Sequence, residues 1–277
     1  MSQPKYSFYA TILDSYQNYL SSSEIYQTFW GFSDEPELTE EEFEQKQFQS
    51  LIDRINRVPF DSEAADQGTV FNEIIDCMIL KCKSEKMEIE NVYETNESFA
   101  ERECNSNGYH SPDAKKRVEF IKAIYNGREF QFPISLCLEF ANYYKGAIPQ
   151  VRTEAIISTR YGDVQLYGYI DELMPTAVHD IKTTKSYTAG DFKKHWQHIV
   201  YPYCLNANGN HVTDFEYNIA EINRTKYGVN YKTFTEYFCY NPETDIKRLT
   251  KHVEGLIEFL ESNKHLITDK KIFNKQD

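Results

Sequence analysis

Hydrophobic residues in the first 145 positions recur mostly with the spacing of amphipathic helices. A capping-box pair, Thr39 and Glu42, precedes one such stretch, and Gly68-Thr69 opens a second. The apolar stripes of these two predicted helices are Phe48, Leu51, Ile52 and Ile55, and then Phe71, Ile74, Ile75, Met78 and Cys82. Ser111-Pro112-Asp113 predicts the start of a third helix, continued by Val118, Ile121 and Ile124 up to Gly127, and residues 132–144 predict a fourth.

Residues 84–110 interrupt this helical pattern. They are polar and show little periodicity. A stretch of this length without a hydrophobic pattern is typical of a mobile loop or an insertion, so we expect one between the second and third helices.

Strand-like segments take over after residue 145. Residues 151–158 and 164–183 predict strands, and Met174-Pro175-Thr176-Ala177 predicts a turn that folds the second stretch into a hairpin. A helix follows from about Gly190, in which Pro202 predicts a kink or an end because proline removes a backbone hydrogen bond. The remaining elements are strands near 215–222 and 231–240 and a C-terminal helix marked by Ile246, Leu249, Val253, Ile257 and Leu260.

These elements predict an α/β fold of the α+β kind, with a mixed central β-sheet flanked by helices. The chain of 277 residues is long enough for one elaborated domain or two small ones. We expect a single domain over 1–277, in which 1–145 is mainly helical and 146–277 forms the core and the C-terminal helix. No apolar run approaches the ~20 residues that span a bilayer, and the first residues lack the pattern of a signal peptide. A cytoplasmic protein without a membrane partner is the expectation.

The predicted hairpin carries the candidate chemistry. Asp171 and Asp180 stand nine positions apart on its two strands, and Lys182 shares a strand face with Asp180 because side chains alternate with a period of two. Carboxylate oxygens are the ligands that Mg²⁺ prefers, and a bound metal can activate water for phosphodiester hydrolysis. A solvated surface ion pair is the alternative interpretation of Asp180 and Lys182 taken alone.

With Gln197 and Tyr201 on the following helix, this order of residues resembles the PD-(D/E)XK nuclease superfamily, in its RecB and lambda-exonuclease branch. The resemblance implies a restriction-endonuclease-like fold. It also implies that Asp171 and Asp180 hold Mg²⁺ or Mn²⁺, with the main-chain carbonyl of Ile181 completing the shell. Lys182 would assist the attacking water, and Gln197 and Tyr201 would reach a substrate phosphate or the lysine-bearing strand.

The chain departs from the family near Gly68. Relatives often carry a histidine where this chain has Asn72, with an acid four residues later, here Asp76. An asparagine can offer an oxygen to Mg²⁺ but is a poorer ligand than imidazole for Mn²⁺. Asn72 is therefore a candidate metal ligand and Asp76 a candidate substrate-binding residue, with a solvated helix edge as the alternative. Glu154, at the start of a strand, is a further candidate metal ligand on its position alone, and an exposed strand glutamate is its alternative.

The net charge of −13 argues against a protein that binds polyanions through its total charge. Its distribution counts for more, because much of the acid lies in 34–44 and 85–103, whereas cations cluster around the motif. The candidate substrate-binding residues there are Thr183, Lys185, Lys193 and Lys194.

Other cofactors find little support in the sequence. The six cysteines, at 77, 82, 104, 137, 204 and 239, include no C-x-x-C pair and no late triplet, so we expect no iron-sulfur cluster. His179 should point away from Asp180 in a regular strand, which disfavours zinc there.

Two functions from different classes follow. The first is a Mg²⁺- or Mn²⁺-dependent deoxyribonuclease, expected to act as an exonuclease in recombination or phage DNA processing, on DNA and with a recombination or single-strand-annealing protein as a possible partner. The second is a catalytically impaired protein of the same fold that binds nucleic acid or serves in assembly. The intact Asp171, Asp180 and Lys182 favour the first, and Asn72 favours the second. Both leave an oligomer possible.

Overall fold

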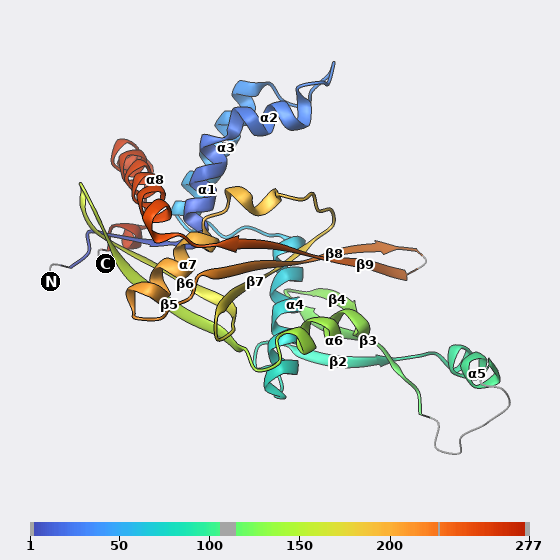
Figure 1. The fold of residues 1–277 in the computed structure, drawn as a ribbon. Helices are drawn as coiled ribbons and strands as arrows, with labels where there is room; N and C mark the ends of the chain where they lie inside the picture. The colour runs from blue at the N-terminus through green and yellow to red at the C-terminus, as the bar shows by residue number, and fades with distance from the viewer. Residues whose placement is uncertain (1–2, 106–114, 227, 275–277) are drawn as a thin grey trace.

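The fold is built on a six-stranded mixed sheet. The computed structural model describes residues 3–105, 115–226 and 228–274. The strand order is β1-β6-β7-β8-β9, with β5 pairing on the other edge of β6 (Figure 1). The pairs β1–β6 and β7–β8 are parallel and the other pairs are antiparallel. The strands are β1 (Tyr6–Tyr9), β5 (Ile148–Thr159), β6 (Gly162–Leu173), β7 (Ala177–Thr184), β8 (Asp214–Thr225) and β9 (Gly228–Cys239).

One face of this sheet packs against the first hydrophobic core. Three helices supply most of its cover: α1 (Ala10–Leu20), α7 (Gln197–Ala207) and α8 (Pro242–Ser262). The short helix α2 (Ser22–Trp30) and the longer α3 (Glu40–Ile55) follow α1. Short 3-10 turns lie at Asp191–Lys194, Lys264–Leu266 and Lys270–Phe273.

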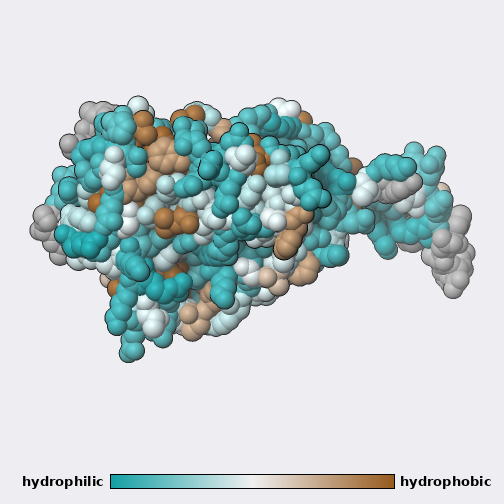
Figure 2. All heavy atoms as spheres, turned by 90° about the horizontal axis from the view of Figure 1, so that it is seen from above, coloured by the Kyte–Doolittle hydropathy of each residue, from teal (hydrophilic) through white to brown (hydrophobic). Residues whose placement is uncertain are grey.

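The opposite face carries a second core over β7 and β8. It is formed by α4 (Glu63–Leu80), α6 (Ile134–Tyr143) and a small antiparallel sheet. That sheet has the order β2 (Glu88–Tyr93), β3 (Val118–Tyr125) and β4 (Arg128–Pro133). The helix α5 (Asn96–Asn105) projects from the end of β2, and Figures 1 and 2 show it on a largely hydrophilic arm.

The structure confirms the mixed α/β class, with a mixed sheet between helices. The predicted hairpin, the strands β5, β8 and β9, and the helices α6 and α8 are present. The capping box is present as well, since Thr39 accepts from the Glu42 amide and Glu42 accepts from the Thr39 amide. In the described part of the chain, no helix has a stretch long and apolar enough to cross a membrane.

Four local predictions were wrong. The second helix starts at Glu63 behind an Ser62 cap, so Gly68 lies inside it. Residues 118–125 form strand β3, because pairing with β2 and β4 outweighs the three-residue spacing of their apolar side chains, which also suits a helix. The predicted helix start at 111–113 lies outside the described residues. The segment 84–110 contains β2 and α5. The first 145 residues thus hold strands as well as helices.

The fourth error concerns the helix end that was one of two alternatives predicted at Pro202, the other being a kink. Pro202 lies inside α7, and the helix continues to Ala207. The lost hydrogen bond is offset by burial, because residues on both sides of Pro202 are fully enclosed in the first core. These residues include Ile199, Val200, Cys204 and Leu205.

A close approach between β6 and α7 fixes the position of that helix. A Cβ added at Gly168 would lie 2.4 Å from Cε1 of Tyr201, which no folded structure tolerates without a shift. Gly168 is therefore required by the ring that lies against it.

We expect Gly168→Ala to lower the free energy of unfolding by about 2–3 kcal/mol, because the overpacked methyl group must push α7 away from the sheet. Urea denaturation followed by circular dichroism measures the change. Gly68→Ala is the control, since an added Cβ there meets Thr183 Oγ1 only at 3.5 Å and alanine favours the helix by ~1 kcal/mol. Equal destabilisation by both changes would contradict the steric argument.

Candidate active site

The site lies where β6 and β7 separate. The two strands pair only through Glu172 with His179 and Leu173 with Val178. Beyond these pairs, the Ile181 amide donates to Asp171 Oδ2 at 2.8 Å, so a carboxylate takes the place of a neighbouring strand. The separation brings the side chain of Asp171 next to the backbone that carries Asp180 and Lys182.

Asp180 and Lys182 lie on the face of β7 that meets α7, as the strand period predicts. Lys182 Nζ is 2.6 Å from Asp180 Oδ2, and it donates to Gln197 Oε1 at 3.0 Å. The same glutamine amide donates through Nε2 to Asp180 Oδ1 at 2.6 Å. Gln197 thus fixes the carboxylate and the ammonium at once.

Tyr201 completes this arrangement one helical turn later. Its hydroxyl oxygen accepts from Gln197 Nε2 at 3.3 Å, and its ring covers Gly168. Burial raises the pKa of Tyr201 well above its ordinary value, with the Asp180 carboxylate adding to the effect. Asp180, Lys182, Gln197 and Tyr201 therefore form one connected network.

The helix α4 places a second group of polar side chains against the site. Gly68, Asn72 and Asp76 follow one another at intervals of one turn, and Gly68 lies beside Thr183 of β7. Asp76 reaches the carboxyl group of Glu172, and the two hydrogen bond when one of them holds a proton. Asn72, which lies between Gly68 and Asp76 on this side of α4, therefore faces the region of the carboxylates.

Four buried oxygens in this group have no hydrogen-bond donor among the described residues: Asn72 Oδ1, Asp76 Oδ1 and both oxygens of Glu172. Unpartnered buried acceptors cost free energy and are stabilised by a proton or a cation. The atoms that could bind a cation here are all oxygens, which suits a hard ion such as Mg²⁺ or Mn²⁺. Asp171 and Asp180 would hold such an ion, with these oxygens close by. Among the described residues, however, no three His, Cys, Asp or Glu side chains already converge in a metal-binding arrangement.

Burial, with negative charge nearby, raises the pKa of three acids at the site: Asp171, Asp76 and Glu172. Burial, followed by the neighbouring Asp180 carboxylate, raises the pKa of Asp171 to about 7. Burial also raises the pKa of Asp76 to about 6, and burial with Asp76 nearby raises that of Glu172 to about 9. For Lys182, burial alone would lower the pKa, but Asp180 and Asp171 raise it above its ordinary value. One ammonium faces several acids, so the site favours added positive charge.

The structure does not bring Glu154 to these carboxylates. Glu154 pairs in register with Tyr167, two side-chain repeats before Asp171 on β6. Its carboxylate is exposed and lies 2.5 Å from Arg152. Glu154 is thus an exposed strand glutamate, which was the alternative to its role as a metal ligand.

The proposed substrate-binding cations lie around the network. Lys185 is exposed just after β7. Lys193 and Lys194 end a short 3-10 turn before α7 and border a hollow with Trp196 and Arg248. Lys194 forms an ion pair with Glu24 at 2.6 Å, so part of its charge is neutralised.

Sequence reasoning missed Glu172. Regular alternation after Asp171 would send the next side chain to the opposite face, towards α7. In the structure Glu172 is fully buried beside Asp76 of α4. The sequence offered one signal, an acid that directly follows the predicted metal ligand Asp171. The direction of the Glu172 side chain, however, depends on the irregular pairing of β6 at this point.

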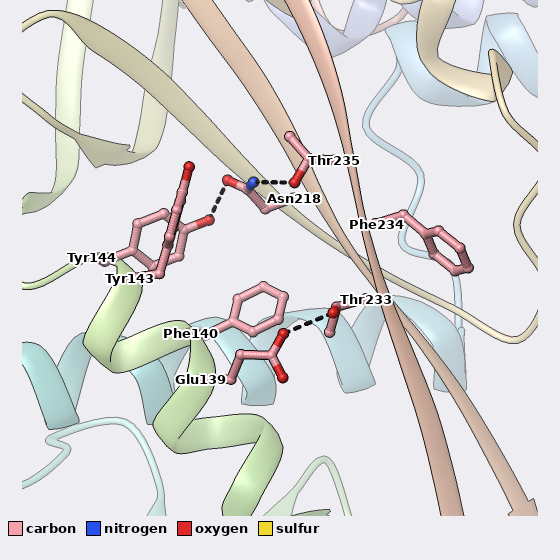
Figure 3. A pocket seen from close by; sticks show the side chains of 8 residues that line it. All are labelled: Glu139, Phe140, Tyr143, Tyr144, Asn218, Thr233, Phe234 and Thr235. Atoms are coloured by element: carbon pink, nitrogen blue, oxygen red, sulfur yellow. Dashed lines mark hydrogen bonds between the residues drawn. The ribbon is translucent and has the colours of Figure 1, made fainter.

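His179 points away from Asp180 into a separate polar network. Its Nδ1 lies 3.1 Å from Asn218 Oδ1, which also accepts from the Tyr144 hydroxyl. Figure 3 shows Tyr144 and Asn218 at a cavity of about 270 Å³ between α6 and β8–β9, where Asn218 also donates to Thr235. None of the predicted site residues lines this cavity, so it is distinct from the candidate active site.

Comparisons with known proteins give no family. No family model and no curated protein matches this chain. A solved crystal structure, that of SSO0001, aligns with 44% of this chain and 57% of its own length, at 17% identity and a TM-score of 0.28. A likeness at that level carries no argument, so the site rests on its own geometry.

The buried acid Glu172 leads to a pH-dependent prediction. Its folded pKa of about 9 exceeds the ordinary value of 4.5, so the folded protein keeps a proton that the unfolded chain has already lost. Stability from this group is complete below about pH 4.5 and is lost as the pH rises towards 9. Glu172→Gln should match the wild type near pH 4.5 and exceed it by roughly 2 kcal/mol near pH 8.5, in EDTA.

Urea titrations at several pH values measure this difference. Glu119→Gln is the control, because Glu119 is exposed on β3 and should follow the wild type throughout. A constant difference between Glu172→Gln and the wild type across the pH range would show that Glu172 does not keep its proton.

Proposed function

We propose that this protein is a Mg²⁺- or Mn²⁺-dependent deoxyribonuclease with a restriction-endonuclease-like core. The observation that carries the proposal is the meeting of Asp171, Asp180 and Lys182 at the separation of two strands, with Gln197 bonded to both Asp180 and Lys182. Surface ion pairs lack such a shared buried partner. The resemblance to the RecB and lambda-exonuclease branch supports the same assignment.

In this mechanism the two aspartates would hold the metal, and the lysine would assist the attacking water. Asp171 and Asp180 would hold the ion with the carbonyl of Ile181, and a bound ion activates water and offsets phosphate charge. Gln197 keeps the Lys182 ammonium beside Asp180, where it can orient water or stabilise negative charge in the transition state. Tyr201 holds Gln197 in place through its hydroxyl group.

A non-catalytic nucleic-acid-binding or assembly protein is the second candidate. The observation in its favour is that Lys182 and Gln197 already occupy both oxygens of Asp180. A metal would have to share that carboxylate with Lys182, and Asn72 stands where relatives carry a histidine. Cleavage of end-labelled and circular DNA in Mg²⁺, Mn²⁺ or EDTA separates the two candidates, because a binding protein leaves all substrates intact.

Asp180→Asn should weaken Mn²⁺ binding at least about tenfold, because an amide oxygen replaces an anionic ligand. Isothermal titration calorimetry measures the affinity. The change keeps the size of the side chain, so folding should be retained. Asp191→Asn, on an exposed turn, is the control and should bind as the wild type does. Equal affinity in the Asp180 variant would remove this carboxylate from the metal site.

Lys182→Met should lower the cleavage rate about 10²–10³-fold while Mn²⁺ binds at least as tightly as before, since the ammonium that competes for Asp180 is gone. Single-turnover assays on end-labelled DNA, with calorimetry beside them, separate rate from affinity. Lys232→Met removes an exposed lysine of β9 and should leave the rate unchanged. Cleavage by the Lys182 variant at the wild-type rate would contradict the mechanism.

A further inference from the structure

Among the described residues, no helix of the second core packs closely on β1, β5 or β6, so the side of these strands opposite the first core is largely uncovered. The helices that pack most closely on these strands are α1, α7 and α8, and all of them belong to the first core. The helices of the second core cover β7 and β8 instead. Arg152, Ile156 and Tyr169 are accordingly exposed on the uncovered side. We call this surface the open face.

An aromatic strip crosses the open face and ends at the candidate active site. Tyr167 and Tyr169 stand at alternate positions of β6, so their side chains leave the strand on one side. Asp171 follows two positions after Tyr169 and accepts from the Ile181 amide where β6 and β7 separate. Tyr169 is 55% exposed, which is unusual for a large ring on a central strand. Tyr9 of β1 stands beside Tyr167 in register, with 6.2 Å between the ring centroids.

Guanidinium groups border the other end of this strip. An open hollow of about 650 Å³ lies there, and its lining includes two cations, one acid and two rings: Arg54, Arg57, Asp53, Tyr9 and Phe60. Arg54 lies over the Phe60 ring at 4.8 Å, and Phe60 is 60% exposed. Arg57 lies 6.0 Å from the centre of the Tyr9 ring and donates to the Tyr167 hydroxyl at 3.4 Å. The cations thus hold the aromatic rings while remaining open to solvent.

We propose that the open face binds single-stranded DNA and leads the strand to Asp171. The exposed rings of Tyr169 and, at the other end of the strip, Phe60 offer stacking surfaces for bases, with the half-buried Tyr9 and Tyr167 between them. The adjoining guanidinium groups can contact phosphates. Arg54 forms no ion pair within the described residues, so its charge is available for a phosphate. The strip is continuous with the candidate active site through Tyr169, and this is why a substrate strand is its occupant. The choice of DNA rests on the proposed nuclease function.

Stacking of this kind distinguishes single strands from duplexes. Bases in a duplex are already stacked on one another, so their faces are closed to tyrosine. The ion pairs near the strip also favour single strands over duplexes, because Asp269 neutralises Arg57 and Glu154 neutralises Arg152. Few free cations remain to neutralise the phosphates of a duplex, and binding must depend mainly on the rings.

The test is binding of a fluorescein-labelled oligothymidylate of ~15 nucleotides, followed by fluorescence anisotropy in EDTA so that no cleavage occurs. The wild type should bind the single strand, and the corresponding duplex should bind several-fold more weakly. Tyr169→Ala should weaken single-strand binding by about tenfold, because one stacking surface is lost. Tyr169→Trp keeps an aromatic face and should bind as the wild type does.

Tyr237→Ala is the matched control, since Tyr237 is 58% exposed on β9, away from the strip; it should not change binding. Wild-type affinity in Tyr169→Ala, or a duplex that binds as tightly as the single strand, would overturn the proposal. This failure is distinguishable from failure of the proposed function. If Lys182→Met loses cleavage but Tyr169→Ala binds as the wild type does, the proposed nuclease function stands and the DNA-binding strip does not. If Tyr169→Ala weakens binding but the wild type cleaves no DNA, the strip stands and the nuclease function does not.

Discussion

The burial of several carboxylates around one ammonium is the constraint on which the rest of this structure depends. Asp180 and Asp171 both act on Lys182, and Glu172 lies beside Asp171 and Asp76. Burial makes the repulsion between neighbouring carboxylates strong. Hydrogen bonds from the backbone and from one glutamine side chain hold these charged groups in place. The Ile181 amide binds Asp171, and Gln197 spans Asp180 and Lys182. The opening between β6 and β7 and the position of α7 are consequences of these bonds.

The two sheet faces have complementary roles at this point. On one face, α7 fixes Asp180 and Lys182, and the absence of a side chain at Gly168 lets Tyr201 close over the strand. On the other face, α4 brings Asn72 and Asp76 towards the same carboxylates and leaves β5 and β6 bare. The site is therefore enclosed by helices above and below β7, while its approach along β6 stays open.

Much of this arrangement could be predicted from short-range sequence pattern. The strand-turn-strand-helix order and the common face of Asp180 and Lys182 follow from periodicity over a few residues. Long-range pairing decided the rest. Residues 118–125 became a strand because β2 and β4 flank them, Glu154 was placed by its register with Tyr167, and Glu172 by the irregular pairing of β6. None of these partners is visible in a local window of sequence.

The parallel pairing of β1 with β6 has a consequence for how the chain folds. Tyr6 to Tyr9 pair with residues more than 150 positions later, and Tyr6 and Phe8 are fully buried in the first core. β1 therefore has no partner until β6 has emerged from the ribosome. Such non-local pairing slows folding and leaves a hydrophobic strand exposed meanwhile. The central sheet can close only after the chain has been synthesised as far as β6.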